Sequence, residues 1–510
     1  MTFPSVLCPI NSEITVYQRE EIPDFFVDLN LDQVIKSITD QKQEYNLTPF
    51  FHSPLQELDA INYRQDVFKD LENANVLKAI KSFAEKMVLV RRYTNMLEKL
   101  YFKYHQEGWF LEAAVTYCEA IQNLARDLKV TPIKSKGLLD FLVYVNKYIT
   151  SSGFLSLQAD SLERKTDLST IEYSVIIKGN WVRVRKYESE IDYSKEVERT
   201  FEKFKQGEVK NYRIDLITSS GMNHVEAQIL ECVAKLYPEI FKQLDLFYQK
   251  HSGFMDNVIL TFDRQIQFFV SYLDFIENLK SKGLQFCYPC VSKDKAIHAQ
   301  ETFDIALANK RLFESTPVVC NDFYLEGKER IFVVSGPNQG GKTTFARMFG
   351  QLHYLASLGC PIPGKEATLF LFDQIFTHFE KEEDIRNLRG KLQDDLVRIH
   401  SILNTATSDS IIIMNEIFTS TALKDAIFLS KEIIQRIIRL DALGVCVTFI
   451  DELSTLGKQT VSMVSTVVPE NPTQRTFKII RMPADGLSYA ICIAEKHHLT
   501  YDLIKERVSE

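Results

Sequence analysis

The chain lacks the segments that would place it in or across a membrane. None of its apolar runs approaches the roughly 20 residues that span a bilayer. The N-terminus has no basic segment leading into an apolar core, so it does not resemble an export signal. From these absences we expect a cytoplasmic protein that makes no membrane contact.

Paired cysteines and an excess of basic residues are also missing. The nine cysteines are scattered, and Cys287 and Cys290 form a Cys-x-x-Cys with no second pair at a suitable spacing for zinc. We therefore expect packed thiols in a reducing compartment. The formal net charge is −8, which argues against a protein whose whole surface binds nucleic acid. It does not exclude a local basic channel.

Proline is scarce in the first half of the chain. Between residues 54 and 285 there are three prolines, at positions 54, 132 and 238. Apolar residues recur there at helical spacing, most clearly over 76–97 and 255–279. This pattern predicts a mainly α-helical scaffold with long helices.

One stretch within this region has the period of a strand. Residues 172–187 alternate, are rich in β-branched side chains, and have Gly179-Asn180 at their centre, so they predict a β-hairpin. The segment that follows, 188–212, is charged and is expected to be helical. Aromatic and cationic side chains on the hairpin could contact a nucleic-acid backbone, or could form a solvated face without a ligand. They are Trp181, Arg183, Arg185 and Lys186.

After about residue 296, short apolar runs alternate with helical patterns. This alternation is typical of a parallel α/β sheet. We expect an N-terminal segment over 1–53, a helical region over 54–295 and an α/β domain over 296–510. The expected strands are 331–335, 411–414 and 445–450, and the expected helices are 342–358 and 421–438.

The first of these strands leads into a glycine-rich loop with the pattern G-x-x-x-x-G-K-S/T. Backbone N–H groups of such a loop surround phosphate oxygens, and the following helix adds its positive N-terminal end. Lys342 would reach the β- and γ-phosphates, and the Thr343 hydroxyl would bind Mg²⁺. The candidate nucleotide-binding residues are Gly336, Pro337, Asn338, Gln339, Gly340, Gly341, Lys342, Thr343 and Thr344.

The second half of the expected site follows the strand at 411–414. An aspartate usually stands next and orients the hydration shell of Mg²⁺, whereas this chain has Asn415. An amide carries no negative charge, so we expect Asn415 to support the metal weakly and turnover to be slow. Glu416 keeps the position of a general base, and together with Lys342 it is a candidate catalytic residue.

The string GPNQGGKTT at 336–344 resembles the phosphate loop of the MutS family of DNA mismatch-repair ATPases. Residues 373–377 are similar to that family's D-x-IFTR segment, 414–417 to its MDEI, and 54–72 to the start of its helical core. The resemblance extends over about residues 50–510. It implies a helical core and lever region followed by a P-loop (ABC-type) ATPase domain, with ATP and Mg²⁺ as cofactors and a homodimer in which each subunit completes its partner's site.

The sequence departs from the family pattern in three places. Fewer than 60 residues precede the core, where the family's mismatch-reading module would stand, and Phe110-Leu111-Glu112 matches its wedge only by chance. The family's signature segment is altered within 383–396. Asp451 stands where a γ-phosphate-sensing histidine is expected, so it is the candidate sensor.

These features favour a slow DNA-dependent ATPase that acts on duplex or branched DNA in repair or recombination. The alternative is a nucleotide-dependent switch or scaffold that has a protein partner and does not bind DNA. A degenerate structural protein agrees less well with the sequence, because Lys342, Thr343 and Glu416 are all retained.

Overall fold

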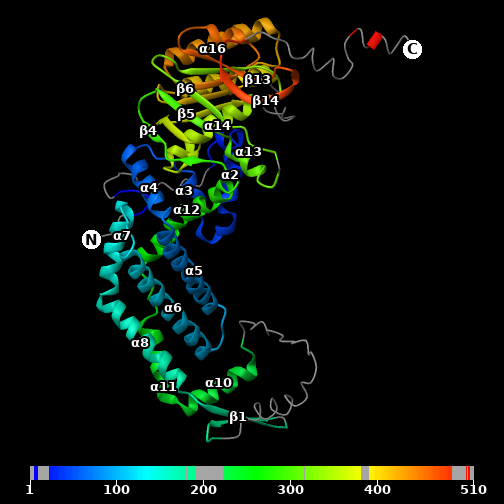
Figure 1. Ribbon diagram of the computed structural model, residues 1–510. Coiled ribbons are helices and arrows are strands. Elements are labelled where there is room, and N and C mark those ends of the chain that lie inside the picture. Colours follow the sequence, from blue (N-terminus) through cyan, green and yellow to red (C-terminus); the bar gives the residue numbers. More distant parts are fainter. Residues whose placement is uncertain are drawn as a thin grey trace. The chain divides into compact units, whose positions relative to one another are not determined.

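A computed structural model of the chain describes residues 5–9, 22–179, 181–189, 222–314, 316–380, 390–484, 501 and 504–505. The chain divides into two compact units (Figure 1). Unit 1 comprises residues 1–72, 134–139 and 264–510, and unit 2 comprises residues 73–133 and 140–263. The boundaries expected at residues 54 and 296 follow the sequence pattern and stay a prediction.

Unit 2 is built mainly from helices. Its two longest, α5 (Ala74–Leu97) and α6 (Lys103–Lys129), pack along each other. The others are α8 (Ser152–Ser169), α10 (His224–Leu236) and α11 (Pro238–Lys250), while α7 (Lys136–Ile149) and α12 (Asn257–Lys280) continue into unit 1. The helices expected at 76–97 and 255–279 are thus confirmed. Phe110 is buried within α6, as a packed core residue would be.

Polar side chains fix where several of these helices begin. The Asn73 side chain accepts a hydrogen bond from the Asn75 N–H at the start of α5, and Ser151 does the same for the Phe154 N–H at the start of α8. At α10, Asn223 and Glu226 form a reciprocal capping box. Such caps satisfy backbone donors that have no partner inside the helix.

The predicted hairpin is confirmed. Strands β1 (Tyr173–Lys178) and β2 (Trp181–Lys186) pair antiparallel, and Gly179 between them has φ 60°. Residues 190–212 of the segment expected to be a charged helix lie outside the described residues.

The centre of unit 1 is a six-stranded sheet with the order β10-β11-β12-β7-β13-β14. Neighbouring strands from β10 to β13 run parallel, and β14 pairs antiparallel with β13. The predicted parallel α/β sheet is therefore confirmed, with an antiparallel edge strand added. The strands are β7 (Ile331–Ser335), β10 (Ile375–Phe379), β11 (Ile411–Asn415), β12 (Leu443–Val447), β13 (Thr460–Val468) and β14 (Asn471–Arg481).

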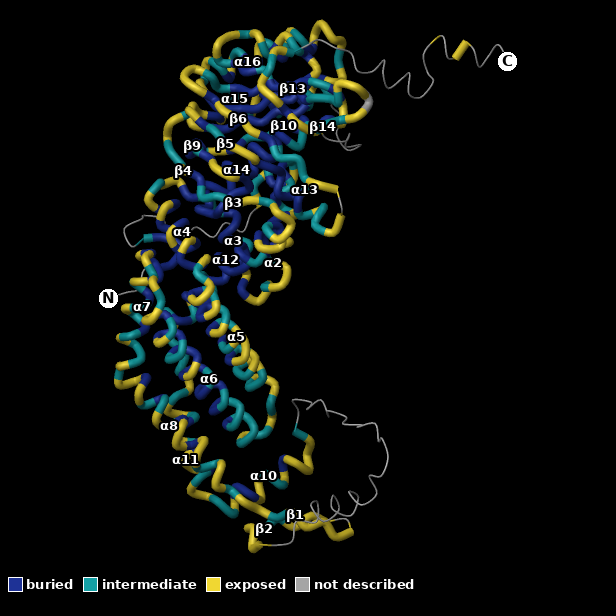
Figure 2. Tube along the Cα trace, viewed as in Figure 1, coloured by how far each residue is buried: buried dark blue, intermediate teal, exposed yellow. Residues whose placement is uncertain are grey.

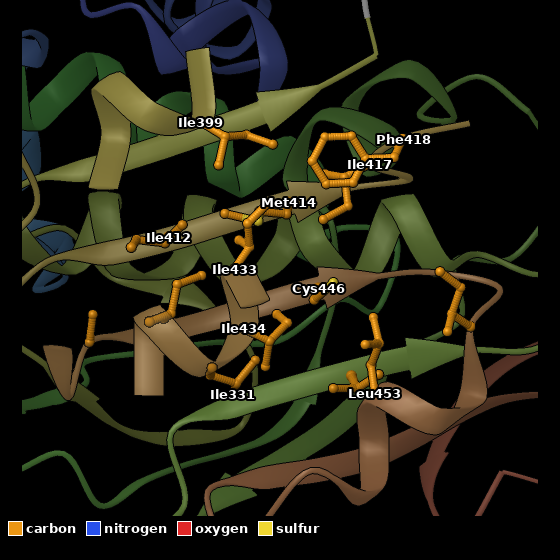
Figure 3. Close-up of a cluster of buried hydrophobic side chains, with 14 of the residues drawn as sticks. Ile331, Ile399, Ile412, Met414, Ile417, Phe418, Ile433, Ile434, Cys446 and Leu453 are labelled. Atoms are coloured by element: carbon orange, nitrogen blue, oxygen red, sulfur yellow. The ribbon is translucent and has the colours of Figure 1, made fainter. Parts of the chain in front are cut away.

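Helices cover both faces of this sheet. On one face, α15 (Lys391–Thr405) and α16 (Leu423–Leu440) pack on side chains that include Ile412 and Met414 (Figure 3). On the other face, α14 (Lys342–Ser357) approaches β11 closely at Gly350, beside Ile413. The continuous apolar run of β11 is explained by this arrangement, because successive side chains of a strand point to opposite faces and here both faces are buried.

A second sheet lies in the same unit. It has four strands in the order β4-β9-β5-β6, and a short pair, β3 with β8, accompanies it. Its elements are β4 (Cys290–Ser292), β5 (Ile297–Thr302), β6 (Asn321–Leu325) and β9 (Glu366–Phe370), with the pair β3 (Phe286–Cys287) and β8 (Ile362–Pro363). The helix α13 (Ile305–Lys310) begins after β5, where the Asp304 carboxylate accepts the Leu307 N–H.

Short helices near the N-terminus complete unit 1. They are α1 (Phe25–Asp28), α2 (Leu31–Thr39), η1 (Asp40–Tyr45), α3 (Thr48–Phe51) and α4 (Leu58–Leu71). The buried guanidinium of Arg64 in α4 donates to the carbonyls of Leu7 and Leu358 and so ties the N-terminal stretch to the end of α14. Figure 2 shows how buried residues gather in the sheets of this unit. None of the described helices is long and apolar enough to cross a membrane.

The two cysteines of the Cys-x-x-Cys motif lie at strand ends, because β3 ends at Cys287 and β4 begins at Cys290. Both are free thiols, and burial raises the pKa of Cys287 to about 11. The described residues contain no group of three or more His, Cys, Asp or Glu side chains placed to hold a metal ion.

Gly444 in β12 tests the close packing of the central sheet. A Cβ atom added there would lie 2.5 Å from the backbone oxygen of Ile412 in β11. We predict that Gly444→Ala lowers the free energy of unfolding by about 1–3 kcal/mol, because the neighbouring strand cannot move away. Urea unfolding of the purified protein measures this.

Gly108→Ala is the matched control. Its Cβ would meet nothing within 4 Å, and the residue lies inside α6. This variant should be more stable by about 0.5–1 kcal/mol, since alanine is the better helix former. Equal stability of the two variants would contradict the close approach of β11 and β12.

Candidate functional site

The glycine-rich loop connects the carboxyl end of β7 to the first turn of α14. Three of its residues have positive φ: Gly336 at 111°, Gln339 at 59° and Gly341 at 93°. Ser465 on the neighbouring strand β13 presses against the loop, and its hydroxyl donates to the Gly340 carbonyl at 2.7 Å. A Cβ atom on Gly340 would lie 2.2 Å from the Ser465 Oγ atom, so only glycine fits there.

Lys342 is the first residue of α14, and its ammonium is surrounded by oxygens of the loop. Its ammonium donates to the Gly336 carbonyl at 2.9 Å, the Pro337 carbonyl at 3.2 Å and the Asn338 Oδ1 atom at 3.2 Å. The residue is only 5% exposed. Burial lowers the pKa of Lys342, and the nearby charge of Glu416 partly opposes this shift. The loop thus holds a cation that phosphate oxygens could share.

The predicted partners of this loop come from the end of β11. The Thr343 hydroxyl donates to the Asn415 Oδ1 atom at 2.8 Å, so these two residues are in direct contact. Glu416 follows with φ 52°, a left-handed conformation that is uncommon for a non-glycine residue. Its N–H donates to the Val447 carbonyl at the end of β12, which fixes the turn that presents its side chain.

A pocket of about 260 Å³ opens beside the loop. Residues 339–344 and Glu416 line one part of it. The other part was not identified from the sequence and consists of Leu307, Arg311, Val319, Asn321 and Phe477. The pocket therefore combines N–H groups and cations with an apolar and aromatic wall, a combination that suits a nucleoside phosphate.

Phe477 owes its place to an unusual backbone. It has φ 59° in β14, near a register irregularity between β13 and β14. The Asn321 side chain holds this segment, because its Nδ2 donates to the Phe477 carbonyl at 3.3 Å and its Oδ1 accepts the Ile479 N–H at 2.7 Å. The Phe477 ring edge lies 3.8 Å from where a Cβ atom of Gly341 would be. The ring is thus placed directly beside the loop.

The side chains present match only part of what Mg²⁺ requires. The Thr343 hydroxyl is a suitable ligand, and Asn415 lies next to it. Among the described residues that line the pocket, Glu416 is the only carboxylate. Mg²⁺ sites usually include one or two carboxylates in addition to phosphate oxygens. The donor set at Thr343 and Asn415 therefore does not fit a tightly held Mg²⁺.

Asp451 does not line this pocket. It begins the short helix η2 (Asp451–Thr455) and lines a separate pocket of about 690 Å³ together with Glu452 and Arg481. Asp451 and the glycine-rich loop thus line different pockets.

The altered signature segment is described only from residue 390 onward. Residues 381–389, which include Glu383 and Asp384, lie outside the described part of the chain. Asp395 in α15 lies 3.2 Å from the Nε2 atom of the buried His378 in β10. Lys391 in the first turn of α15 pairs with Glu380, which also accepts a hydrogen bond from Thr419 at 3.2 Å. The start of α15 is thereby tied to the loop that follows Glu416.

The candidate DNA contacts all lie on the hairpin of unit 2. Alternation along β2 puts Trp181, Arg183 and Arg185 on one face of the hairpin and Lys186 on the other. Trp181 is 55% exposed, and Arg183 is exposed as well. The Lys186 ammonium lies over the ring of Tyr237, 5.0 Å from its centroid. Three of the four predicted residues therefore share a face.

Comparison with known proteins gives one family match and several relatives. Residues 332–508 match the family described as MutS domain V. The chain is 30% identical over 247 residues to the DNA mismatch repair protein MutS of Listeria welshimeri, which is 47% of this chain and 28% of that protein. It is 29% identical over 277 residues to a protein of the same name from Listeria monocytogenes (52% and 32%) and 26% identical over 241 residues to one from Staphylococcus epidermidis (46% and 27%). The matched part thus spans no more than about a third of these relatives.

The lowered pKa of Lys342 leads to a prediction on pH. A bound phosphate favours the charged ammonium, so the pKa rises on binding, and affinity is full below the pKa of the free protein. Affinity should then fall as pH rises through that pKa, which lies below the ordinary 10.5. Titration with a fluorescent ATP analogue between about pH 7 and about pH 10 measures this. Lys342→Arg, which stays charged, should lose the alkaline fall, and a pH-independent affinity of the unmodified protein would exclude contact between the ammonium and the ligand.

The aromatic wall gives a second prediction. Phe477→Ala should weaken binding of ATP about tenfold, because stacking of a base on an aromatic ring contributes about 1–3 kcal/mol. Binding of inorganic triphosphate, which has no base, should be unchanged in the same variant. An equal loss for both ligands would show that Phe477 only supports the loop.

Proposed function

Because residues 332–508 match the family described as MutS domain V, we propose that the chain is a MutS-like protein that binds ATP in the pocket beside the glycine-rich loop and hydrolyses it slowly. The α/β domain would then be a P-loop ATPase domain of the ABC type. The observation that carries this proposal is the arrangement of Lys342, Thr343 and Glu416 around one pocket at the carboxyl ends of β7 and β11.

Each residue has a role that its position supports. Lys342 would exchange its loop oxygens for β- and γ-phosphate oxygens, while the N–H groups of 339–344 surround them. Leu307, Val319 and Phe477 would bind the base and ribose. Glu416 would accept a proton from the attacking water. Mg²⁺ supplies charge neutralisation in such reactions, and turnover is expected to be slow because Asn415 supports the ion poorly.

The proposed second ligand is duplex or branched DNA. The relatives carry the name DNA mismatch repair protein MutS, and the hairpin offers an exposed tryptophan and two arginines on one face. Aromatic and cationic side chains of this kind contact nucleic-acid backbones and bases. We propose that the chain acts in repair or recombination as a homodimer whose subunits complete each other's ATP sites.

A protein partner in place of DNA is the second candidate function. The net charge of −8 favours it, as does the other face of the hairpin, where Val175, Ile177 and Val182 are exposed. In that case the nucleotide would act as a switch without DNA.

The test is steady-state ATP hydrolysis by the full chain in Mg²⁺, alone and with linear or four-way-branched DNA. Hydrolysis should depend on Glu416, so Glu416→Gln should lower the turnover number at least about 100-fold while ATP binding persists. DNA should change the turnover number. Turnover that Glu416→Gln leaves intact would contradict the assigned base, and turnover indifferent to DNA would favour the protein-partner switch.

The hairpin gives a separate prediction. The double variant Arg183→Ala/Arg185→Ala should weaken DNA binding and reduce the dependence of log affinity on log salt by about 2. Lys186→Ala, on the opposite face, is the matched control and should have a smaller effect. Equal effects of both variants would argue against a specific contact face.

A further inference from the structure

We propose that this pocket binds the nucleotide through its own cations and an amide, so that Mg²⁺ contributes little to affinity. This inference rests on the proposed ATP site and defines its ligand more closely as a nucleoside triphosphate without bound Mg²⁺. It concerns three residues of the chain: Asn415, Arg475 and Arg311. The two arginines belong to neither of the sequence motifs that predicted the site.

The first argument is the number of acceptor atoms at position 415. A carboxylate has two oxygens, so it can accept from the threonine hydroxyl and from a metal-bound water together. Asn415 has one oxygen, and the Thr343 hydroxyl already donates to it at 2.8 Å. The other atom of the amide is an NH₂ group, which only donates. A metal-bound water can reach only the second lone pair of this neutral oxygen, which is a weaker acceptor than the second oxygen of a charged carboxylate.

Asn415 does not itself line the pocket, but it adjoins Thr343 and Glu416, which do. Phosphate oxygens are acceptors, and Asn415 lies at the end of β11 beside Thr343, the residue that adjoins the pocket. The substitution of an amide for a carboxylate thus removes a repulsion between like charges and supplies a donor. The change disfavours the hydrated metal and favours the bare phosphate.

The second argument is the cation content around the loop. Arg475 on β14 donates from its Nε atom to the Asn338 carbonyl of the loop at 3.2 Å, and its charge contributes to the lowered pKa of Lys342. Arg311, which follows α13, lines the pocket itself. Lys342 and Arg311 thus place two positive charges on the pocket wall, where Glu416 is the only carboxylate among the described lining residues. Arg475 adds a charge beside the loop, and Glu314 pairs with Arg311 at 3.8 Å.

These charges can perform the neutralisation that a divalent ion performs elsewhere. Arginine is suited to this task because its planar guanidinium stays charged and binds phosphate with two parallel hydrogen bonds. A polyphosphate in the pocket would meet cations from the loop, from α13 and from β14. Affinity should therefore depend strongly on these cations, and its dependence on Mg²⁺ should be small.

The experiment is equilibrium binding of ATP to the full chain by isothermal titration calorimetry, in EDTA and in excess MgCl₂. The dissociation constants of the unmodified protein should agree within about threefold between the two conditions. Asn415→Asp should bind at least about tenfold more weakly in EDTA than in MgCl₂, because a second acceptor and a negative charge now support the ion. Asn415→Ala, which adds no charge, should stay as insensitive to Mg²⁺ as the unmodified protein.

Arg475→Ala tests the cations independently of position 415. It should weaken binding about tenfold in EDTA, since one positive charge beside the loop is lost. Arg481→Ala is the matched control on the same strand, because Arg481 pairs with Glu329 and is not among the described residues that line the pocket. Thermal unfolding of each variant shows that it is folded.

Two results would overturn the inference. One is a loss of affinity of about tenfold or more when Mg²⁺ is removed from the unmodified protein. The other is an Asn415→Asp variant that is as insensitive to Mg²⁺ as the unmodified protein. Absence of ATP binding in both conditions is a different failure, because it would remove the proposed function itself.

Discussion

A buried ammonium needs oxygen partners, and the site of this protein depends on how that need is met. Lys342 is taken out of water at the start of α14, and its three acceptors are all atoms of the loop that precedes it. An unpaired charge in that position would be costly, so the loop must curl, and the curl requires glycine where Ser465 presses against it. The parallel sheet supplies the rest, because the carboxyl ends of β7, β12 and β11 bring Glu416 and Asn415 to the same edge.

Much of this arrangement could be predicted from the sequence, because local patterns determine it. The apolar runs 331–335 and 411–414 are β7 and β11, and the glycines between 336 and 341 mark the loop. The hairpin followed from alternation around Gly179. Contacts between distant segments could not be predicted in this way. Asn321 and Phe477 are 156 residues apart, and the positive φ of Phe477 has no sequence signature, so the aromatic wall of the pocket was missed.

The same limit applies to residues assigned by analogy alone. Asp451 follows the correct strand, yet it lines a pocket separate from the glycine-rich loop. Arg475 lies on β14 and reaches the loop only through the bond to Asn338, which no motif contains. Asn415 was recognised as a departure from the family pattern, but its physical meaning depends on the bond from Thr343, which the sequence does not reveal. The neutral amide of Asn415 and the arginines near the pocket, Arg311 and Arg475, all favour binding of a polyanion.

The central claim is that Lys342 exchanges oxygens of its own loop for those of a nucleotide. The most direct measurement is a crystal structure of the full chain with a non-hydrolysable ATP analogue. The account predicts β- and γ-phosphate oxygens within about 3 Å of the Lys342 Nζ atom and the base against Phe477. A nucleotide bound elsewhere, with the Lys342 ammonium still hydrogen-bonded to the three oxygens of its own loop, would contradict it.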